Sequence, residues 1–274
     1  MSKLRYVRDP NLSPPVRRGL DCTVESLRVV YETDPAIHAA LLPRPLQPYR
    51  RPEIFIQHAN VSMHVSDTKT VTIGAATVGV RCSFEGTEGH YVLAMPMQGE
   101  FVVIGGRERF GEPKKIAEVA TMERDGSKIT TTIGRHGINF LEMTGHIQAE
   151  SVVPDPFTEY FFCHKALPRI DGHDGFDGPV YLTRLNWERN YSALHEVSDA
   201  QVILRESPFD PLVDVPVDNI VGMQFAVGST NTSGQILTEI PQEYLVNHIH
   251  QRYDDGLDVG IELDQTGARA TAHG

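Results

Sequence analysis

The chain has little of what marks several protein classes. It has three cysteines, Cys22, Cys82 and Cys163, far apart and without Cys-x-x-Cys spacing, which argues against a disulfide framework or a zinc cluster. No run of about 18 apolar residues is present, so no membrane-spanning helix is expected. Acidic residues outnumber basic ones 36 to 25, for a formal net charge of -11, whereas nucleic-acid binders need an excess of basic residues. We expect a cytoplasmic protein with reduced thiols that binds neither nucleic acid nor membranes.

Motifs for metals and nucleotides are also missing. The glycine-rich stretch GGRERFG (105–111) lacks the Gly-x-Gly-x-x-Gly order of a dinucleotide site. His248 and His250 are two residues apart and have no evident third ligand. The aspartates in DGHDGFDG (171–178) do not follow the spacing of a calcium loop. We therefore expect neither a metal nor a cofactor.

Short runs of β-branched and aromatic residues recur along the chain, with turn residues between them. SLRVVYE (26–32) is typical of a strand, and Asp125-Gly126 lies between two β-prone runs, as in a hairpin. The run EFVVI (100–104) also predicts a buried strand. Because strands and helices do not alternate regularly, the pattern predicts a mainly β (α+β) fold, antiparallel, with a few short peripheral helices.

The expected helices are few and short. Asp34 can cap a helix in TDPAIHAALLP (33–43), and further short helices are predicted in PVDNIVGM (216–223) and IPQEYLVNHIHQRY (240–253). We divide the chain into an N-terminal arm (1–20), a single domain (21–258) and a flexible C-terminal tail (259–274).

Two adjacent lysines, Lys114 and Lys115, follow Pro113 between segments of apolar composition. A lysine with its usual pKa of about 10.4 is protonated at neutral pH and is not a nucleophile. Burial and a neighbouring cation both lower a lysine pKa. The free amine then attacks carbonyl groups, and the protonated imine accepts electrons in decarboxylation, aldol addition or dehydration. A pair of lysines is also common at solvated turns and strand edges, so the spacing alone leaves both interpretations open.

The surrounding sequence resembles the active-site signature of the acetoacetate decarboxylase family. Gly106-Arg107-Glu108 is followed, after the spacer RFGE, by Pro113-Lys114-Lys115. The resemblance extends over 27–247, through RVVYETD (28–34), SFEGTEGHYVLAM (83–95), CHKALP (163–168) and DPLVDVPVDNIV (210–221). It implies an antiparallel β-barrel or cone-like sheet, a Schiff base at Lys114 with Lys115 as its neighbour, and a homo-oligomer.

The chain departs from the family in its pocket. The family has two glutamates and an N-terminal arginine there, but the resemblance places Gln57 at the first glutamate, Ala75 at the second and Val24 near the arginine. No glutamate lies between Glu53 and Glu85. The chain is thus identified as a divergent member that lacks the pocket glutamates. Family relatives that lack them resemble aldolase-dehydratases, which act on pyruvate-like 2-oxo acids and aldehydes.

The catalytic candidates lie in the signature itself: Lys114, Lys115, Glu112 and Glu108. In an extended segment, side chains alternate between faces. We therefore expect Lys115 to point away from the pocket and Glu112 to share the face of Lys114. Glu112 is a candidate acid/base in place of the missing glutamates, or else an exposed turn residue.

The substrate-binding candidates are Arg107, Gln57 and Arg81. The guanidinium fork of Arg107 could bind a carboxylate or form an ion pair with Glu108, and Arg81 is a weaker candidate on a probable strand.

These observations predict a lyase that forms a Schiff base with a small-molecule keto acid through Lys114. Because the pocket glutamates are missing, we favour an aldolase-dehydratase that uses a pyruvate-like 2-oxo acid and an aldehyde co-substrate. Decarboxylation of acetoacetate or another β-keto acid is the alternative. An alternative of another class is a non-catalytic protein that binds a small carboxylate or a hydrophobic ligand in the same pocket.

Overall fold

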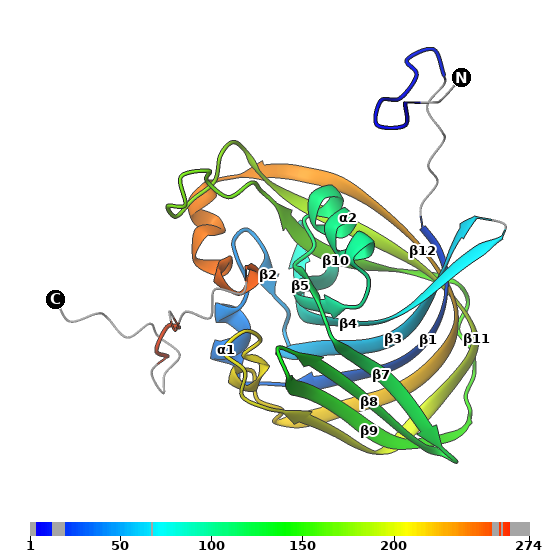
Figure 1. The fold of residues 1–274 in the computed structure, drawn as a ribbon. Coiled ribbons are helices and arrows are strands. Elements are labelled where there is room, and N and C mark those ends of the chain that lie inside the picture. Colours follow the sequence, from blue (N-terminus) through cyan, green and yellow to red (C-terminus); the bar gives the residue numbers. More distant parts are fainter. Residues whose placement is uncertain (1–3, 13–19, 67, 254–257, 259, 264–274) are drawn as a thin grey trace.

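A computed structural model describes residues 4–12, 20–66, 68–253, 258 and 260–263. Strands make up most of the described chain, as Figure 1 shows, which confirms the predicted mainly β fold. Much of the expected N-terminal arm and most of the expected tail (259–274) lie outside the described residues. Within the described part, no helix is both long and apolar enough to cross a bilayer.

The elements follow one another as a long series of strands with few helices between them. The strands are β1 (Leu20–Glu32), β2 (Gln47–Pro48), β3 (Glu53–Ser66), β4 (Lys69–Phe84), β5 (Thr87–Met97), β6 (Lys114–Ile116), β7 (Val119–Asp125), β8 (Lys128–Arg135), β9 (Ile138–Glu150), β10 (Phe157–Lys165), β11 (Val180–Leu204) and β12 (Asn219–Ile240). The helices are α1 (Pro35–Ala40) and α2 (Glu100–Phe110), with 3₁₀ turns η1 (Leu212–Asp214), η2 (Gln242–Tyr244), η3 (Val246–His248) and η4 (His250–Arg252).

Seven strands close into a barrel in the order β10-β5-β4-β3-β1-β12-β11, because β11 pairs back onto β10. The ring is antiparallel except where β5 meets β10. These two strands run parallel and pair only at Phe161–His90 and Phe162–Tyr91. Beyond this short contact, β5 pairs with β6 instead. The barrel confirms the architecture that the resemblance implied.

The sheet continues from β11 into β9, β8 and β7, which lie below the barrel in Figure 1. Side chains alternate between the two faces of each strand. On β3, Ile54 and Ile56 join the core that includes Ile129 and Met143 of the β7–β9 extension. Phe55, between them, packs with the group that lines the barrel interior. Alternate side chains of β3 therefore point into the barrel, and those between them point out of the barrel toward the core shared with β7–β9.

The expected strand at 100–104 is wrong, because Glu100–Phe110 forms helix α2. Val103 and Gly106, three residues apart, share the buried face, and Glu108 is exposed. Gly111 ends the helix in the left-handed conformation, with φ of 77°, which glycine adopts without strain. Packing of one helical face on the barrel outweighs the strand propensity of the valines and the isoleucine.

Among the other short elements, Asp34 caps α1 by accepting from the N–H groups of Ala36 and Ile37, as predicted. The helix expected at 216–223 is wrong, since β12 begins at Asn219 and is held by its pairing with β1 and β11. The expected C-terminal helices are present as the 3₁₀ turns η2, η3 and η4.

Candidate active site

The lysine signature forms a three-residue strand in the barrel wall. Lys114 pairs with Met95 and Lys115 with Pro96, in parallel with β5. Met95 is buried among the side chains that line the barrel interior. Since residues paired across neighbouring strands point to the same face, Lys114 also points into the barrel, where its side chain is 11% exposed.

Lys114 meets a carboxylate there. Its Nζ lies 2.8 Å from Oε2 of Glu112, whose side chain is 3% exposed. Glu112 is therefore a buried partner of the amine and not an exposed turn residue, and the two share a face as predicted. Gly106 of α2 packs over the pair. A Cβ added to Gly106 would lie 2.2 Å from Oε2 of Glu112 and 2.6 Å from Nζ of Lys114, so this position leaves no room for a side chain.

Lys115 points the other way. Its Nζ donates to the carbonyl oxygen of Phe209 at 2.6 Å and lies 3.3 Å from Oδ1 of Asp210. Nη1 of Arg135 donates to the other oxygen of Asp210 at 2.7 Å. Burial raises the pKa of Asp210, although both cations oppose it. The expectation that Lys115 faces away is confirmed. It ties the wall to the segment that holds Asp210 and contributes no group beside the Lys114 amine, which argues against a catalytic role.

The other charged candidates lie away from the Lys114 amine. Nη1 of Arg107 donates to the carbonyl oxygens of Lys114, at 2.8 Å, and of Arg252, at 3.1 Å. Arg107 therefore anchors the backbone of the reactive strand. Glu108 is exposed on α2. Arg81 forms an ion pair with the exposed Glu88 at 2.7 Å. In these contacts Arg107 meets backbone carbonyl oxygens and Arg81 meets Glu88, not the lysine amine.

Gln57 does lie in the barrel interior, within a polar cluster that sequence reasoning missed. Nη2 of Arg189 on β11 donates to Oε1 of Gln57 at 3.0 Å, and its Nε donates to Oε2 of Glu159 on β10 at 2.8 Å. Arg28 on β1 donates to the other oxygen of Glu159 and to the hydroxyl of Tyr191. We call Arg28, Glu159 and Arg189 the arginine cluster.

The cluster includes an arginine on β1, the strand on which the resemblance places the family's arginine near Val24. This interior arginine is Arg28, which pairs directly with Gln57. Val24 itself is a buried apolar residue of the barrel interior. The two positions lie four residues apart on one strand and so share a face. Strand alternation combined with the one arginine in RVVYETD was the signal that could have identified Arg28.

Electrostatics fix the charges of this interior. Burial alone would raise the pKa of Glu159, but Arg189 and Arg28 outweigh it and lower the pKa to about 2. Burial lowers the pKa of His90 to about 3, so the imidazole is neutral at pH 7. Two guanidinium groups and one carboxylate leave the cluster with one net positive charge.

Aromatic rings join the cluster to the lysine. Ring centroids lie 5.5 Å apart for His90 and Phe161 and 4.1 Å apart for Phe161 and Trp187. Cys163, two residues beyond Phe161 on β10, marks the lysine end, because burial and the nearby Glu112 carboxylate raise the pKa of its thiol. Phe161 and Cys163 belong to the same apolar group of the barrel interior as Met95, the strand partner of Lys114.

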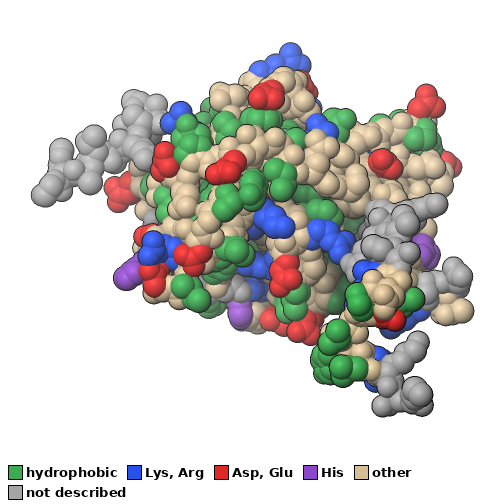
Figure 2. All heavy atoms as spheres, turned by 90° about the horizontal axis from the view of Figure 1, so that it is seen from above, with side chains coloured by type: hydrophobic (Ala, Val, Ile, Leu, Met, Phe, Trp, Pro, Cys, Tyr) green, Lys and Arg blue, Asp and Glu red, His purple; other side chains and the backbone are tan. Residues whose placement is uncertain are grey.

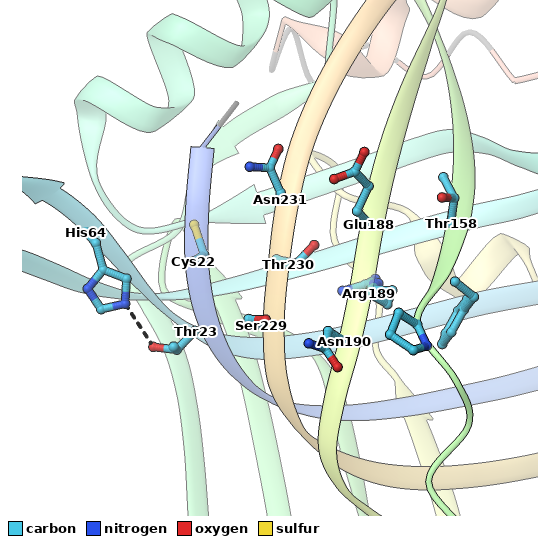
Figure 3. Close-up of a pocket in the computed structure, with 12 residues that line it drawn as sticks. Cys22, Thr23, His64, Thr158, Glu188, Arg189, Asn190, Ser229, Thr230 and Asn231 are labelled. Carbon is cyan, nitrogen blue, oxygen red and sulfur yellow. Dashed lines mark hydrogen bonds between the residues drawn. The ribbon is translucent and has the colours of Figure 1, made fainter. Parts of the chain in front are cut away.

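A hollow of about 560 Å³ lies beside β1, β11 and β12, and Arg189 of the arginine cluster is one of the residues that line it. Figure 3 shows Thr23, Ser229 and Asn190 lining it, with Thr23 hydrogen-bonded to His64 at 3.4 Å. Lys114 and Glu112 are not among its lining residues. On the face shown in Figure 2, basic and acidic side chains are interspersed rather than gathered by sign. Neither feature adds a charged group to the lysine site.

Comparison with known proteins agrees with this architecture. The family model for acetoacetate decarboxylase matches residues 7–239. A curated acetoacetate decarboxylase from Ralstonia nicotianae is 35% identical over 203 residues, covering 70% of this chain and 77% of the relative.

Solved structures share the fold at lower identity. One from structural studies of acetoacetate decarboxylase has a TM-score of 0.70 at 18% identity and covers 84% of this chain and 96% of its own. The enduracididine biosynthesis enzyme MppR, complexed with pyruvate, has a TM-score of 0.66 at 16% identity and covers 84% and 93%. With the family model spanning most of the barrel and the Pro-Lys-Lys strand in its wall, the chain belongs to the acetoacetate decarboxylase family.

Proposed function

We propose that this protein is a lyase that forms a Schiff base between Lys114 and a keto acid. The observation that carries the proposal is the Lys114 amine inside the barrel, 2.8 Å from the Glu112 carboxylate. A carboxylate at this distance can take the proton from an ammonium group and return it to a leaving hydroxyl. The match to the acetoacetate decarboxylase family and to a curated acetoacetate decarboxylase supports a lyase.

The imine forms in two steps. Glu112 takes a proton from Lys114, and the free amine adds to the ketone carbon to give a carbinolamine. The carbinolamine then loses its hydroxyl as water, with a proton returned from Glu112, and leaves a positively charged imine. Glu112, again a carboxylate, lies beside that charge and stabilises it.

We further propose aldol addition followed by dehydration, with a pyruvate-like 2-oxo acid and an aldehyde. Glu112 removes a proton from the carbon next to the imine, which gives an enamine. The enamine carbon bonds to the aldehyde carbon, and the aldehyde oxygen takes the proton held by Glu112 to become a hydroxyl group. Loss of that hydroxyl group together with a second proton from the former enamine carbon gives water and a carbon–carbon double bond. Hydrolysis of the imine then releases the product and restores the Lys114 amine. Gln57, an amide, occupies the interior where the family has a glutamate, which favours this reaction. A neighbouring structure of MppR holds the condensation product of pyruvate and imidazole 4-carboxaldehyde.

Decarboxylation is the second candidate, and the curated relative at 35% identity, named acetoacetate decarboxylase, favours it. Here the bond to the carboxylate of a β-keto acid breaks, carbon dioxide leaves, and the electron pair moves to the imine. Both reactions need the imine at Lys114, so they differ only after it has formed.

A reductive trap tests the imine. The protein is incubated with pyruvate or acetoacetate, reduced with borohydride and examined by mass spectrometry. We expect a covalent adduct on Lys114 that is lost in Lys114→Ala. No adduct with either acid, or an adduct that persists in Lys114→Ala, contradicts the proposal. A non-catalytic binding protein would instead be stabilised by the ligand to the same extent in Lys114→Arg.

Two product assays then separate the reactions. Release of carbon dioxide from acetoacetate identifies the decarboxylase. Consumption of pyruvate together with an aromatic aldehyde, with a new conjugated product, identifies the aldolase-dehydratase.

A further inference from the structure

We propose that Arg252 is a positioning residue that holds the Glu112 carboxylate at the Lys114 amine. It acts through the peptide group between Gly111 and Glu112. The catalytic consequence of this contact rests on the proposed function. The anchoring itself rests on hydrogen bonds from Arg252 to two backbone segments that lie 88 and 141 residues away along the chain.

The guanidinium group of Arg252 bridges these two segments. Its Nη2 donates to the carbonyl oxygen of Gly111 at 2.5 Å, and its Nη1 donates to the carbonyl oxygen of His164 at 2.9 Å. A hydrogen bond from a charged donor is roughly twice as strong as one between neutral groups. Arg252 therefore joins strand β10 firmly to the turn that follows helix α2.

Gly111 lies directly on the backbone of β10. A Cβ added to Gly111 would lie 2.4 Å from the carbonyl oxygen of His164 and 2.7 Å from Cα of Lys165. This close approach places the carbonyl oxygens of Gly111 and His164 within reach of a single guanidinium group. Two carbonyl oxygens cannot form a hydrogen bond with each other, and Arg252 supplies a donor to each of them.

The carbonyl group of Gly111 belongs to the same planar peptide group as the N–H of Glu112. That N–H donates to the carbonyl oxygen of Gly106 at 3.4 Å, which is a long hydrogen bond. Arg252 therefore provides the shorter of these two contacts with the plane. Because the plane sets the direction in which the Glu112 side chain leaves the backbone, its rotation would move the carboxylate relative to Nζ of Lys114, which lies 2.8 Å away.

The backbone of Arg252 is connected to the lysine as well. Nη1 of Arg107 donates to the carbonyl oxygen of Lys114 at 2.8 Å and to that of Arg252 at 3.1 Å. The centroid of the Tyr253 ring lies 5.4 Å from Cζ of Arg107. The C-terminal segment thus contacts the lysine strand through Arg107, in addition to the peptide group that precedes Glu112.

The end of helix α2 has an anchor of its own. The carbonyl oxygen of Phe110, the last residue of the helix, accepts from the hydroxyl of Thr183 at 2.7 Å. Contacts of this kind satisfy the last carbonyl groups of a helix, which have no partner within it. Loss of Arg252 should therefore leave α2 in place and release mainly the peptide group that precedes Glu112.

The first test compares Arg252→Met with Arg205→Met, a matched control because Arg205 also donates to a backbone carbonyl oxygen, that of Asn139 on β9. The rate of borohydride trapping is measured against the concentration of pyruvate and of acetoacetate. We expect Arg252→Met to lower the maximal rate about tenfold, since a displacement of about 1 Å can cost a hundredfold, and to leave the half-saturating concentration unchanged. Arg205→Met should change neither, and Arg252→Lys should recover part of the rate. A folded Arg252→Met that reacts as the natural chain does overturns the inference.

A double-mutant cycle tests whether Arg252 acts through Glu112. Arg252→Met is introduced into the natural chain and into Glu112→Gln, and imine formation is measured for all four proteins. We expect the effect of Arg252→Met to fall from about tenfold to below about twofold once the carboxylate is gone. An equal effect in both backgrounds would show a general structural role and overturn the inference. If Arg252→Met fails to fold, Arg252→Lys replaces it in the same cycle, with the same two outcomes.

A third measurement does not depend on the proposed function. Amide hydrogen exchange reports how often a backbone N–H group opens to water. We expect exchange at Glu112 to be faster in Arg252→Met than in the natural chain, and unchanged in Arg205→Met. If the natural chain forms no imine but this difference is seen, the proposed function fails and the anchoring by Arg252 stands. If exchange at Glu112 is the same in all three proteins, the anchoring is refuted.

Discussion

Gly106→Ala should favour helix α2 and at the same time slow the reaction of Lys114. Alanine favours a helix by about 1 kcal/mol over glycine. At Gly106, however, the new Cβ would lie 2.2 Å from Oε2 of Glu112 and 2.6 Å from both Nζ and Cδ of Lys114. Separations this short are not tolerated, so the side chains of the pair must move. We expect formation of the imine to slow at least tenfold, which corresponds to about 1.4 kcal/mol.

The matched control is the preceding residue. Gly105 is exposed on the same helix, and a Cβ added there meets nothing within 4 Å. Gly105→Ala should therefore raise the free energy of unfolding by about 1 kcal/mol and leave imine formation unchanged. The assay is the rate of borohydride-trapped adduct with pyruvate, together with urea unfolding of both variants. If folded Gly106→Ala reacts at the rate of Gly105→Ala, then the close approach of the helix does not position the amine.

Three further predictions concern the groups around this site. Lys115→Met should lower the free energy of unfolding by about 3 kcal/mol, because it removes one cation from a buried ion pair with Asp210; the folded variant should form the imine normally, and a large loss of reactivity would contradict its structural role. Glu112→Gln should slow imine formation by the folded variant roughly a hundredfold; an unchanged rate would show that another group moves the proton. Acid should destabilise the fold below about pH 6.5, because burial lowers the pKa of His58 to about 4 and of His90 and His164 to about 3. The unfolded state then binds more protons, and each histidine costs up to about 1.4 kcal/mol per pH unit. Urea unfolding near pH 7.5 and pH 5 measures this loss, and equal stability at both values would contradict it.

The local chemistry of the signature could be predicted from the sequence. Alternation along an extended segment places Lys114 and Glu112 on one face and Lys115 on the other, and the structure agrees. These residues are neighbours in the chain, so their relative orientation depends on local backbone geometry alone.

Relations between distant segments could not be predicted in the same way. Arg28, Glu159 and Arg189 meet only because β10 closes the barrel against β11 and β5. A single sequence can indicate that two neighbouring strands pair across a tight turn, as at Asp125-Gly126, but it contains no such signal for strands far apart in the chain. The helix at Glu100–Phe110 was missed for a related reason: Val102, Val103 and Ile104 favour strands locally, and packing on the barrel decides otherwise.

The three-residue strand β6 has a consequence for how this protein can diversify. It continues the pairing of β5 beyond the two-residue contact with β10, so the segment that carries Lys114 also completes the wall. Arg107 holds its backbone through a hydrogen bond to the carbonyl oxygen of Lys114. A change that displaces the backbone at Lys114 would therefore open the barrel. Substitutions on β1, β3, β10 and β11, in contrast, alter only the side chains that face Lys114. New substrates should arise by replacing residues across the lumen while the nucleophile stays fixed in its place.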